Sequence, residues 1–179
     1  MQIYDFVKFS ALLYIKFAKI LQGGGKNTKM QSNIYISLAM ENDLSNLAKT
    51  EDVCFSDAWS ENALLSQIKS DYALTLVVKD ENANICGYIS GGLTPPEAEI
   101  FRVATLPEYR RCGIGRFALS EFISLAKEKG CTDFFIEVRE SNTPARALYS
   151  SFGFFEAGKR KNYYSSPKED AILLSLKIS

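Results

Sequence analysis

The stretch Glu97–Arg116, EAEIFRVATLPEYRRCGIGR, decides how the middle of this chain folds. Alternating apolar residues in its first half predict a buried strand, which Pro107 ends. Gly113 and Gly115 then open a helix. The N-terminus of a helix presents unpaired N–H groups and the positive end of the helix dipole. This order of strand, glycine turn and helix therefore predicts a site for a pyrophosphate-bearing cofactor.

The same turn is positively charged, because three arginines flank its glycines. Their cations favour a bound phosphate. The residues expected to contact the cofactor here are Arg110, Arg111, Cys112, Gly113, Ile114, Gly115 and Arg116. The Cys112 thiol is either reactive or a filler of the turn, and we favour the filler.

The composition limits the chemistry. The chain has 179 residues, which suits one domain with one core. Lysine plus arginine and aspartate plus glutamate each number 21, so no overall basic field indicates direct binding of nucleic acid. The absence of histidine excludes Ser-His-Asp and Cys-His nucleophiles and most zinc sites. Acid–base chemistry must therefore use Glu, Asp, Tyr, Lys or Cys, and no metal is expected.

The cysteines indicate a reducing compartment. They are spread along the chain without a CxxC pair, at Cys54, Cys86, Cys112 and Cys131. This spacing argues against a zinc ribbon or a redox dithiol. We expect a cytoplasmic protein.

Residues 1–29 differ from the rest, because Lys8, Lys16 and Lys19 interrupt an apolar run. These charges argue against a membrane-spanning helix, and no clear cleavage site marks a signal peptide. The segment is either an added helix on the domain or an upstream start that is not used; a helix at a membrane surface is less favoured. We expect an extension of unclear role at 1–29, a domain at 30–179, and no stable membrane contact.

From residue 31 onward the pattern predicts short alternating elements. Further strands are expected at 34–36, 73–79, 85–91, 132–138, 154–161 and 171–178, with a loop at 162–170. Helices are expected after a cap at Asn42 or Asp43, after Ser60, from Gly115 to Lys129, and after a cap at Thr143. Trp59, just before Ser60, either packs as a staple or borders a substrate groove.

One carboxylate lies in a strand that is otherwise nearly all apolar. Glu137 has as neighbours Phe134, Phe135, Ile136 and Val138, which predict buried surroundings. A carboxylate in such surroundings needs a partner or a chemical role.

One interpretation of the glycine turn is a dinucleotide fingerprint, Gly113-Ile-Gly115-Arg-Phe-Ala118, with Glu137 as the ribose-binding acid. A dinucleotide-binding domain continues as alternating strands and helices. Here a hairpin precedes the turn and only one further short helix follows. The oxidoreductase interpretation is therefore disfavoured.

A second interpretation uses the same turn as Arg110-x-x-Gly113-x-Gly115 and adds the later segment Asn142-x-x-Ala145-x-x-Leu148-Tyr149-x-x-x-Gly153-Phe154. From about Ile34 to the C-terminus the chain resembles the GNAT family of acetyl-CoA-dependent N-acetyltransferases. The resemblance implies an α/β (α+β) fold with a mixed, mostly antiparallel central sheet flanked by helices. It also implies acetyl-CoA as co-substrate.

Four segments narrow the resemblance to a bacterial subfamily that acetylates the N-terminal alanine of small-subunit ribosomal protein eighteen. They are Ala58-Trp59-Ser60, Ile136–Asn142, Arg160–Tyr164 and Glu169–Ile172. The chain departs from the subfamily where Arg102-Val103-Ala104-Thr105-Leu106-Pro107 stands in place of Asn-Ile-Ala-Val-Asp-Pro, and where Ala58 replaces the proline before tryptophan. These departures concern peptide specificity more than the reaction. The implied partner is a ribosomal-protein N-terminus, and the implied state is a monomer or weak dimer.

The resemblance also implies roles for individual residues. Glu137 matches the general base, which takes a proton from the amine directly or through water. Tyr149 matches the general acid, since a phenol with a pKa near 10 can protonate a thiolate whose conjugate acid has a pKa near 8.5. The residues expected around the rest of the cofactor are Val103, Ala104, Thr105 and Asn142; those expected at the peptide groove are Trp59, Tyr163 and Tyr164, with Glu97 and Glu99 as weaker candidates.

Each assignment has a structural alternative. In the structural alternative, Glu137 only caps a helix or pairs with Arg139. Tyr149 is then a packed tyrosine with its hydroxyl at the surface, and Asn142 is only a loop or capping residue. The tyrosine pair at 163–164 would then belong to the core. At the level of function, the rivals are acetylation of lysine or a small amine, and a CoA-binding module without catalysis.

Overall fold

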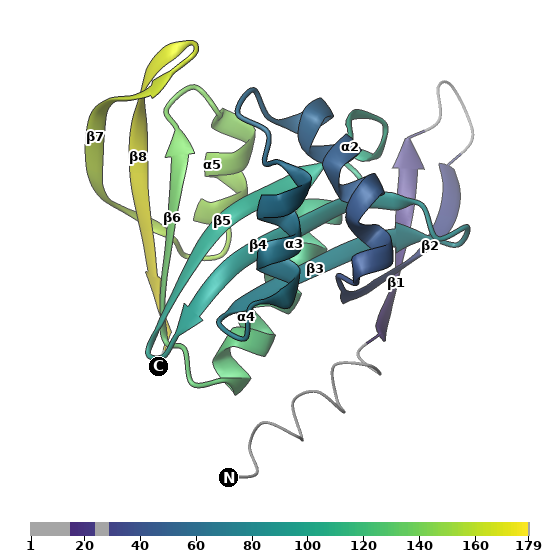
Figure 1. The fold of residues 1–179 in the computed structure, drawn as a ribbon. Helices are drawn as coiled ribbons and strands as arrows, with labels where there is room; N and C mark the ends of the chain where they lie inside the picture. Colours follow the sequence, from purple (N-terminus) through teal and green to yellow (C-terminus); the bar gives the residue numbers. More distant parts are fainter. Residues whose placement is uncertain (1–14, 24–28, 179) are drawn as a thin grey trace, which may run out of the picture.

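The computed structural model describes residues 15–23 and 29–178, and one eight-stranded sheet runs through them (Figure 1). Its strands in chain order are β1 (Ile15–Gly23), β2 (Lys29–Leu38), β3 (Ala73–Asp80), β4 (Ile85–Thr94), β5 (Glu97–Thr105), β6 (Asp133–Arg139), β7 (Phe155–Ser165) and β8 (Lys168–Lys177). In space the order is β1-β2-β3-β4-β5-β6-β8-β7. Within the described residues only β5 and β6 pair in parallel. The predicted mixed, mostly antiparallel sheet is confirmed, and the dinucleotide alternative has no such topology.

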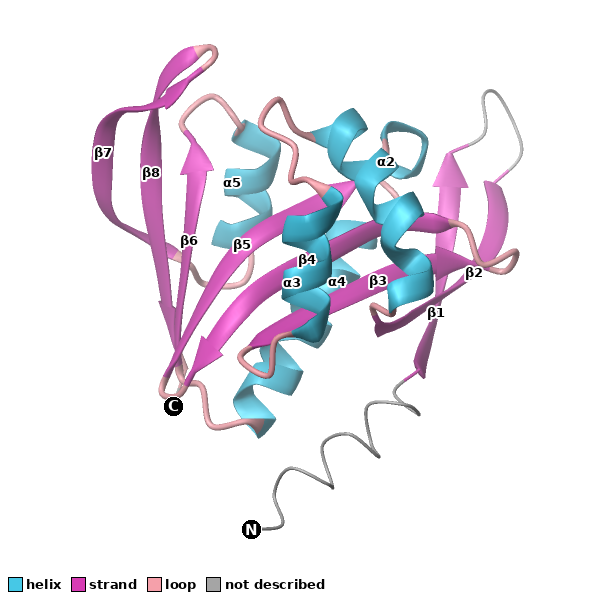
Figure 2. Cartoon of the chain, in the orientation of Figure 1, coloured by secondary structure: helices cyan, strands magenta, loops and turns pink. Residues whose placement is uncertain are grey.

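Helices cover both faces of the sheet (Figure 2). On one face lie α2 (Leu44–Cys54), which follows the short 3₁₀ turn η1 (Glu41–Asp43), and α3 (Glu61–Lys69). On the other lie α4 (Ile114–Glu128), which follows η2 (Pro107–Tyr109), and α5 (Thr143–Ser150). Each helical layer buries its own apolar cluster, with Leu47 and Leu64 in the first and Phe122 in the second. Helices therefore cover the centre of the sheet on both faces.

The parallel pair β5/β6 is short, and this opens the sheet. The ladder joins only Glu97–Ile100 to Asp133–Ile136. Beyond it β5 continues to Thr105 and β6 to Arg139, and the two strands diverge (Figure 2). A gap between diverging strands exposes backbone N–H and C=O groups that a ligand can pair with.

The helix starts follow the predicted chemistry with two corrections. Asp43 stands at the start of α2, but its carboxylate makes no capping bond to that helix and instead accepts from the Met40 N–H at 3.0 Å. The Ser60 hydroxyl caps α3 and accepts a hydrogen bond from the Ala63 N–H at 3.3 Å, as predicted. The predicted cap Thr143 is wrong by one residue, because the Asn142 side-chain oxygen accepts from the Ala145 N–H at 3.2 Å. Asparagine is at least as good a cap as threonine.

The N-terminal segment also needs a correction. The helix considered for residues 1–29 is wrong for Ile15–Gly23, which form β1 and pair antiparallel with β2 along its length. The free edge of β2 offers a ladder that an isolated helix would lack. Expectations on residues 1–14 lie outside the described residues. None of the helices in 15–23 and 29–178 is long and apolar enough to cross a membrane.

The closing hairpin is longer than predicted. Most of the expected loop 162–170 belongs to β7 and β8, and Tyr164 pairs with Glu169. The register between β7 and β8 shifts between Arg160 and Tyr164, where Asn162 has a left-handed φ of 54°. The Asn162 N–H donates to the Asp170 carboxylate at 2.7 Å and stabilises this irregularity. The bulge disguised the strand pattern in the sequence.

Candidate active site

The glycine turn between β5 and α4 has a backbone shape that glycine makes possible. Gly113 is the N-cap of α4 with φ of 87°, a left-handed value that side chains disfavour. A Cβ there would meet no atom within 4 Å, so conformation and not crowding requires glycine. The first helical bond runs from the Phe117 N–H to the Gly113 carbonyl at 2.9 Å. The N–H groups of the first turn therefore have no helical partner, as an anion site needs.

The three arginines of the turn differ in their contacts. Arg110 Nε donates to the Thr105 carbonyl at 3.2 Å and ties the turn to the end of β5. Arg116 Nη2 donates to the Ser151 hydroxyl at 2.8 Å, at the far end of α5. Arg111 is exposed and has a left-handed φ of 65°. Arg111 is the best placed of the three to meet an incoming phosphate.

The predicted cofactor strand lies at the open end of the sheet. Val103 and Thr105 pair with β4 opposite Ile89 and Gly87, on one edge only. Their other edge faces the gap beyond the β5/β6 ladder. The Thr105 carbonyl already accepts from Arg110 Nε, and the rest of this edge of residues 103–105 has no strand partner.

Glu137 lies on β6 immediately after the last β5/β6 pair. Its side chain is 21% exposed, and its Oε1 lies 2.6 Å from Arg160 Nη1 on β7. The prediction of buried surroundings is wrong in part, because Phe135 on the same face of the strand is 37% exposed. That face of β6 is not covered by α2 or α3 (Figure 2). The alternative partner Arg139 is also wrong, since Arg139 pairs with Glu169 at 3.5 Å.

Tyr149 on α5 is 4% exposed and packs edge-on against Phe154, with ring centroids 5.8 Å apart. The prediction of a surface hydroxyl on a merely packed tyrosine does not match this burial. Burial, followed by the nearby Tyr164, raises the pKa of Tyr149 above its ordinary value. The phenol is therefore protonated at neutral pH, as an ordinary tyrosine is, and burial makes it a weaker acid than an exposed one.

Two further tyrosines close the group. Tyr163 and Tyr164 on β7 meet edge to face at 5.1 Å. A hydrogen bond to Glu137, together with burial, raises the pKa of Tyr163. Burial and the Glu137 carboxylate raise the pKa of Tyr164. Tyr163 and Tyr164 therefore lie near Glu137, and Tyr164 also lies near Tyr149, so residues from three separate elements gather here.

Other predicted positions lie farther off. Glu97 and Glu99 lie in the paired part of β5, opposite Asp133 and Phe135, and so at the closed end of the ladder. Trp59 packs against Phe101 with ring centroids 6.2 Å apart and is half-buried, so its position is compatible both with packing and with a place beside a groove.

The cysteines show no sign of activation. Burial raises the pKa of the thiols of Cys54, Cys86 and Cys131, that of Cys86 to about 12. The Cys112 thiol donates to the Arg110 carbonyl at 3.4 Å within the turn. Across residues 15–23 and 29–178, no three Cys, Asp or Glu side chains gather in a way that would hold a metal ion.

Comparison with known proteins identifies the family of this chain. Residues 43–154 match the model of the acetyltransferase (GNAT) family, more than half of the chain. The chain belongs to the GNAT acetyltransferase family. That range runs from η1 to the end of α5 and includes the glycine turn, Glu137 and Tyr149.

Individual relatives are similar over most of their length. The [ribosomal protein bS18]-alanine N-acetyltransferase of Haemophilus influenzae is 35% identical over 136 residues, which cover 74% of this chain and 91% of that protein. The enzyme of the same name from Escherichia coli K12 is 36% identical over 123 residues, covering 68% and 82%. The crystal structure of the ribosomal-protein-S18-alanine N-acetyltransferase from Escherichia coli superposes with a TM-score of 0.75 at 33% identity, covering 82% of this chain and 94% of that one.

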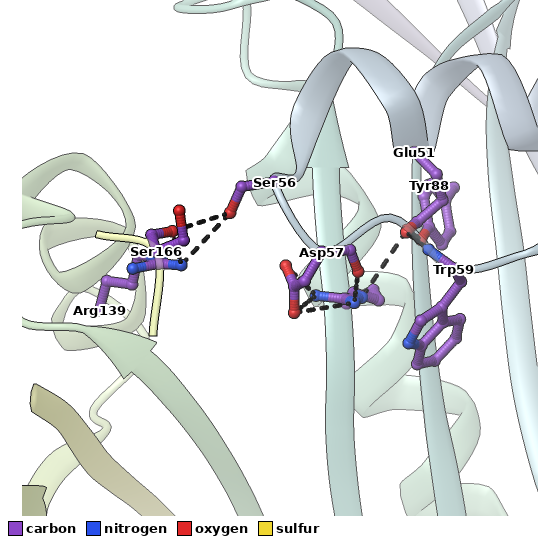
Figure 3. A network of polar contacts seen from close by, with 8 residues as sticks. Glu51, Ser56, Asp57, Trp59, Tyr88, Arg139 and Ser166 are labelled. Atoms are coloured by element: carbon purple, nitrogen blue, oxygen red, sulfur yellow. Dashed lines mark hydrogen bonds and ion pairs between the residues drawn. The ribbon is translucent and has the colours of Figure 1, made fainter. Parts of the chain in front are cut away.

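The structure of this GNAT chain also reveals a polar network that the sequence interpretation missed (Figure 3). Glu51 on α2 is fully buried, and it accepts from the Tyr88 hydroxyl and, at 2.6 Å, from the Trp59 N–H. Arg102 Nε lies 3.8 Å from the same carboxylate. The signal for this network was Arg102 itself, a charged residue inside a buried strand and a departure from the subfamily pattern. Glu51 gave no signal, because a glutamate on an amphipathic helix is usually exposed.

Proposed function

We propose that this protein transfers an acetyl group from acetyl-CoA to the N-terminal α-amine of a protein, and that its substrate is the N-terminal alanine of ribosomal protein bS18. The substrate assignment is supported by the relatives of that name, which align over most of their length. The observation that carries the chemistry is the position of the Glu137 carboxylate, directly after the last β5/β6 pair, with Tyr164 lying near both Glu137 and the buried Tyr149. With a ribosomal protein as partner, the reaction belongs in the cytoplasm.

The residues of the turn suit the phosphates of the donor. The free N–H groups at the start of α4 and the Arg111 guanidinium hold the pyrophosphate. Gly113 keeps that surface clear of side chains. The backbone of Val103, Ala104 and Thr105 pairs with the pantetheine arm as another strand would, and Asn142, at the start of α5, contacts it from the other side. Acetyl-CoA supplies the thioester whose carbonyl carbon is attacked.

Glu137 handles the proton of the amine. An α-amine has a pKa of about 7.7–8.0, so much of it is protonated at neutral pH and must lose a proton before it attacks. The Glu137 carboxylate, held by Arg160 at 2.6 Å, accepts that proton directly or through a water molecule. The nitrogen then bonds to the acetyl carbon.

Tyr149 handles the leaving group. When the C–S bond breaks, the thiolate needs a proton, and the Tyr149 hydroxyl donates it. The hydroxyl is protonated at neutral pH and so holds the proton that the thiolate needs, although burial raises its pKa and makes it a weaker acid. A backbone N–H in the 103–105 segment holds the oxygen of the tetrahedral intermediate. One bond forms, one breaks, and one proton moves at each end.

The polypeptide enters between two connections of the chain. Trp59 lies on the α2–α3 loop, and Tyr163 and Tyr164 lie on the facing hairpin. These aromatic side chains form the walls for the first residues of the substrate. The catalytic unit is residues 30–179, acting as a monomer or weak dimer.

The test compares three peptides with acetyl-CoA: one that begins with the N-terminal alanine of bS18, the same peptide with a blocked N-terminus, and a blocked peptide that contains lysine. Mass spectrometry should find acetylation only of the first. Glu137→Gln should lower kcat by about a hundredfold or more and leave CoA binding unchanged. Acetylation of the blocked lysine peptide, or full activity of Glu137→Gln, would contradict the proposal.

A further inference from the structure

The α2–α3 loop, residues 55–60, is wrapped around one side chain that comes from the sheet. The guanidinium carbon of Arg102 lies 4.5 Å from the centre of the Phe55 ring and 5.0 Å from that of Trp59. Arg102 Nη2 donates to the Asp57 carbonyl at 2.8 Å and contacts the Asp57 carboxylate at 3.3 Å. Two aromatic rings of the loop therefore lie against the Arg102 cation, and Asp57 makes polar contacts with its end.

The base of this arginine is fixed in the core. Its side chain is 13% exposed, and Nε is buried at 3.8 Å from the fully buried Glu51 carboxylate. Glu51 also holds the Trp59 N–H at 2.6 Å. A buried ion pair often stabilises a fold no more than well-packed apolar residues of the same size would, because both charges lose their hydration. The pair of Glu51 and Arg102 therefore suggests a role beyond stability.

The same loop reaches the opposite wall of the site (Figure 3). The Ser56 hydroxyl donates to the Ser166 carbonyl at 3.4 Å, and Arg139 Nη2 contacts both Ser56 Oγ at 3.3 Å and the Ser166 carbonyl at 3.1 Å. Arg139 in turn stacks on Tyr164, 4.0 Å from the ring centre. The α2–α3 loop carries Trp59 on one side of the proposed peptide path and, through Ser56 and Arg139, contacts the hairpin that carries Tyr164 on the other side.

We propose that Arg102 is a positioning residue for the polypeptide substrate, which holds the α2–α3 loop so that Trp59 and Ser56 form one wall of the peptide path. The inference rests on the proposed function for the identity of the substrate. A planar guanidinium packs against aromatic rings while its fork of N–H groups binds a carboxylate and a carbonyl at once, which a lysine ammonium does not. Arg102 thus acts through the loop and does not touch the reacting atoms.

The test uses Arg102→Lys, which keeps a cation near Glu51 and so protects the fold. The expected result is a KM for the bS18 peptide raised by about tenfold, because the forked and stacked contacts are lost, with kcat within about twofold of wild type. The Kd of CoA should not change. Asp57→Asn, whose side chain is 60% exposed, should raise KM less, and the double variant should be no worse than Arg102→Lys alone. Asp133→Asn, which loses an ion pair with Lys177 far from the loop, is the matched control and should leave KM unchanged.

A second readout is independent of catalysis. Trp59 is the only tryptophan of the chain, so its fluorescence reports the loop directly. Arg102→Lys should make Trp59 more accessible to iodide quenching, while Asp133→Asn should not. Unchanged quenching, or an additive double variant, would overturn the positioning role. If the wild-type protein acetylates no N-terminal peptide, yet Arg102→Lys still makes Trp59 more accessible to iodide, the proposed function alone would be overturned.

Discussion

Replacing Tyr149 with phenylalanine removes one hydroxyl from a side chain that is otherwise packed. The ring of Tyr149 is 4% exposed and meets Phe154 edge-on at 5.8 Å, and phenylalanine keeps both the buried area and this contact. The free energy of unfolding should therefore change by no more than about 1 kcal/mol, the usual worth of one hydrogen bond. For a domain of this size that is a shift of about 2–4 °C in Tm. A large loss of kcat in the folded Tyr149→Phe variant must therefore come from the missing hydroxyl and not from unfolding.

The expected loss of kcat in Tyr149→Phe is about a hundredfold or more, which corresponds to about 2.7 kcal/mol in the barrier. Steady-state release of free CoA thiol with the bS18 peptide measures it, and calorimetric binding of CoA checks that the donor site is intact. Tyr149→Ala is the contrasting variant, since it should lose about 3–5 kcal/mol of stability through the cavity it creates.

The pH dependence gives an independent check. The raised pKa of Tyr149 means that the hydroxyl keeps its proton to higher pH than an exposed tyrosine does. The alkaline limb of kcat should therefore lie above about pH 10, the ordinary pKa of tyrosine, and should vanish in Tyr149→Phe. A variant with wild-type kcat, or an alkaline limb at the same pH in both proteins, would refute Tyr149 as the proton donor.

Three further outcomes follow from other parts of the molecule. Gly87→Ala places a Cβ 2.4 Å from the Ala104 carbonyl oxygen, so we expect a loss of about 1–3 kcal/mol in stability, measured by thermal unfolding. Tyr88→Phe deprives the buried Glu51 carboxylate of a donor, and urea denaturation should find the variant less stable by about 1.5–3 kcal/mol; an unchanged midpoint would mean that this hydrogen bond does not stabilise the fold. Arg111→Asn, which tolerates the left-handed φ of 65°, should raise the Kd of CoA by about tenfold in calorimetry, and an unchanged Kd would remove Arg111 from the phosphate site.

The sequence predicted the order of the elements well, because each carried a local signal. Gly113 marked the turn before α4, Ser60 capped α3 as expected, and the hairpin of β3 and β4 was bounded by turn residues. The mixed sheet followed from the family resemblance. Local signals failed where context decides: Ile15–Gly23 became a strand because β2 offers an edge, and the bulge near Asn162 hid the length of β7.

The site was predicted in part for the same reason. Glu137 and Tyr149 were visible as a carboxylate among apolar residues and a tyrosine in a recognisable segment. Their partners were not, since Arg160 and Tyr164 reach them only through the antiparallel pairing of β7 with β8. The Glu51 and Arg102 pair joins a helix to a strand 51 residues later in the chain, a relation that no local period encodes.

Within the described residues, the four residue pairs that join β5 to β6 are the only ladder between the first five strands and the last three. The edge proposed to hold the donor belongs to β5, whereas Glu137 and Tyr149 belong to the part of the chain that follows β5. In the proposed reaction, the geometry of this ladder sets the line of attack of the amine on the thioester. Ile100 and Ile136 are both buried in this ladder. Conservative changes there would therefore lower kcat by changing how the reacting groups are aligned, although none of those groups is itself replaced.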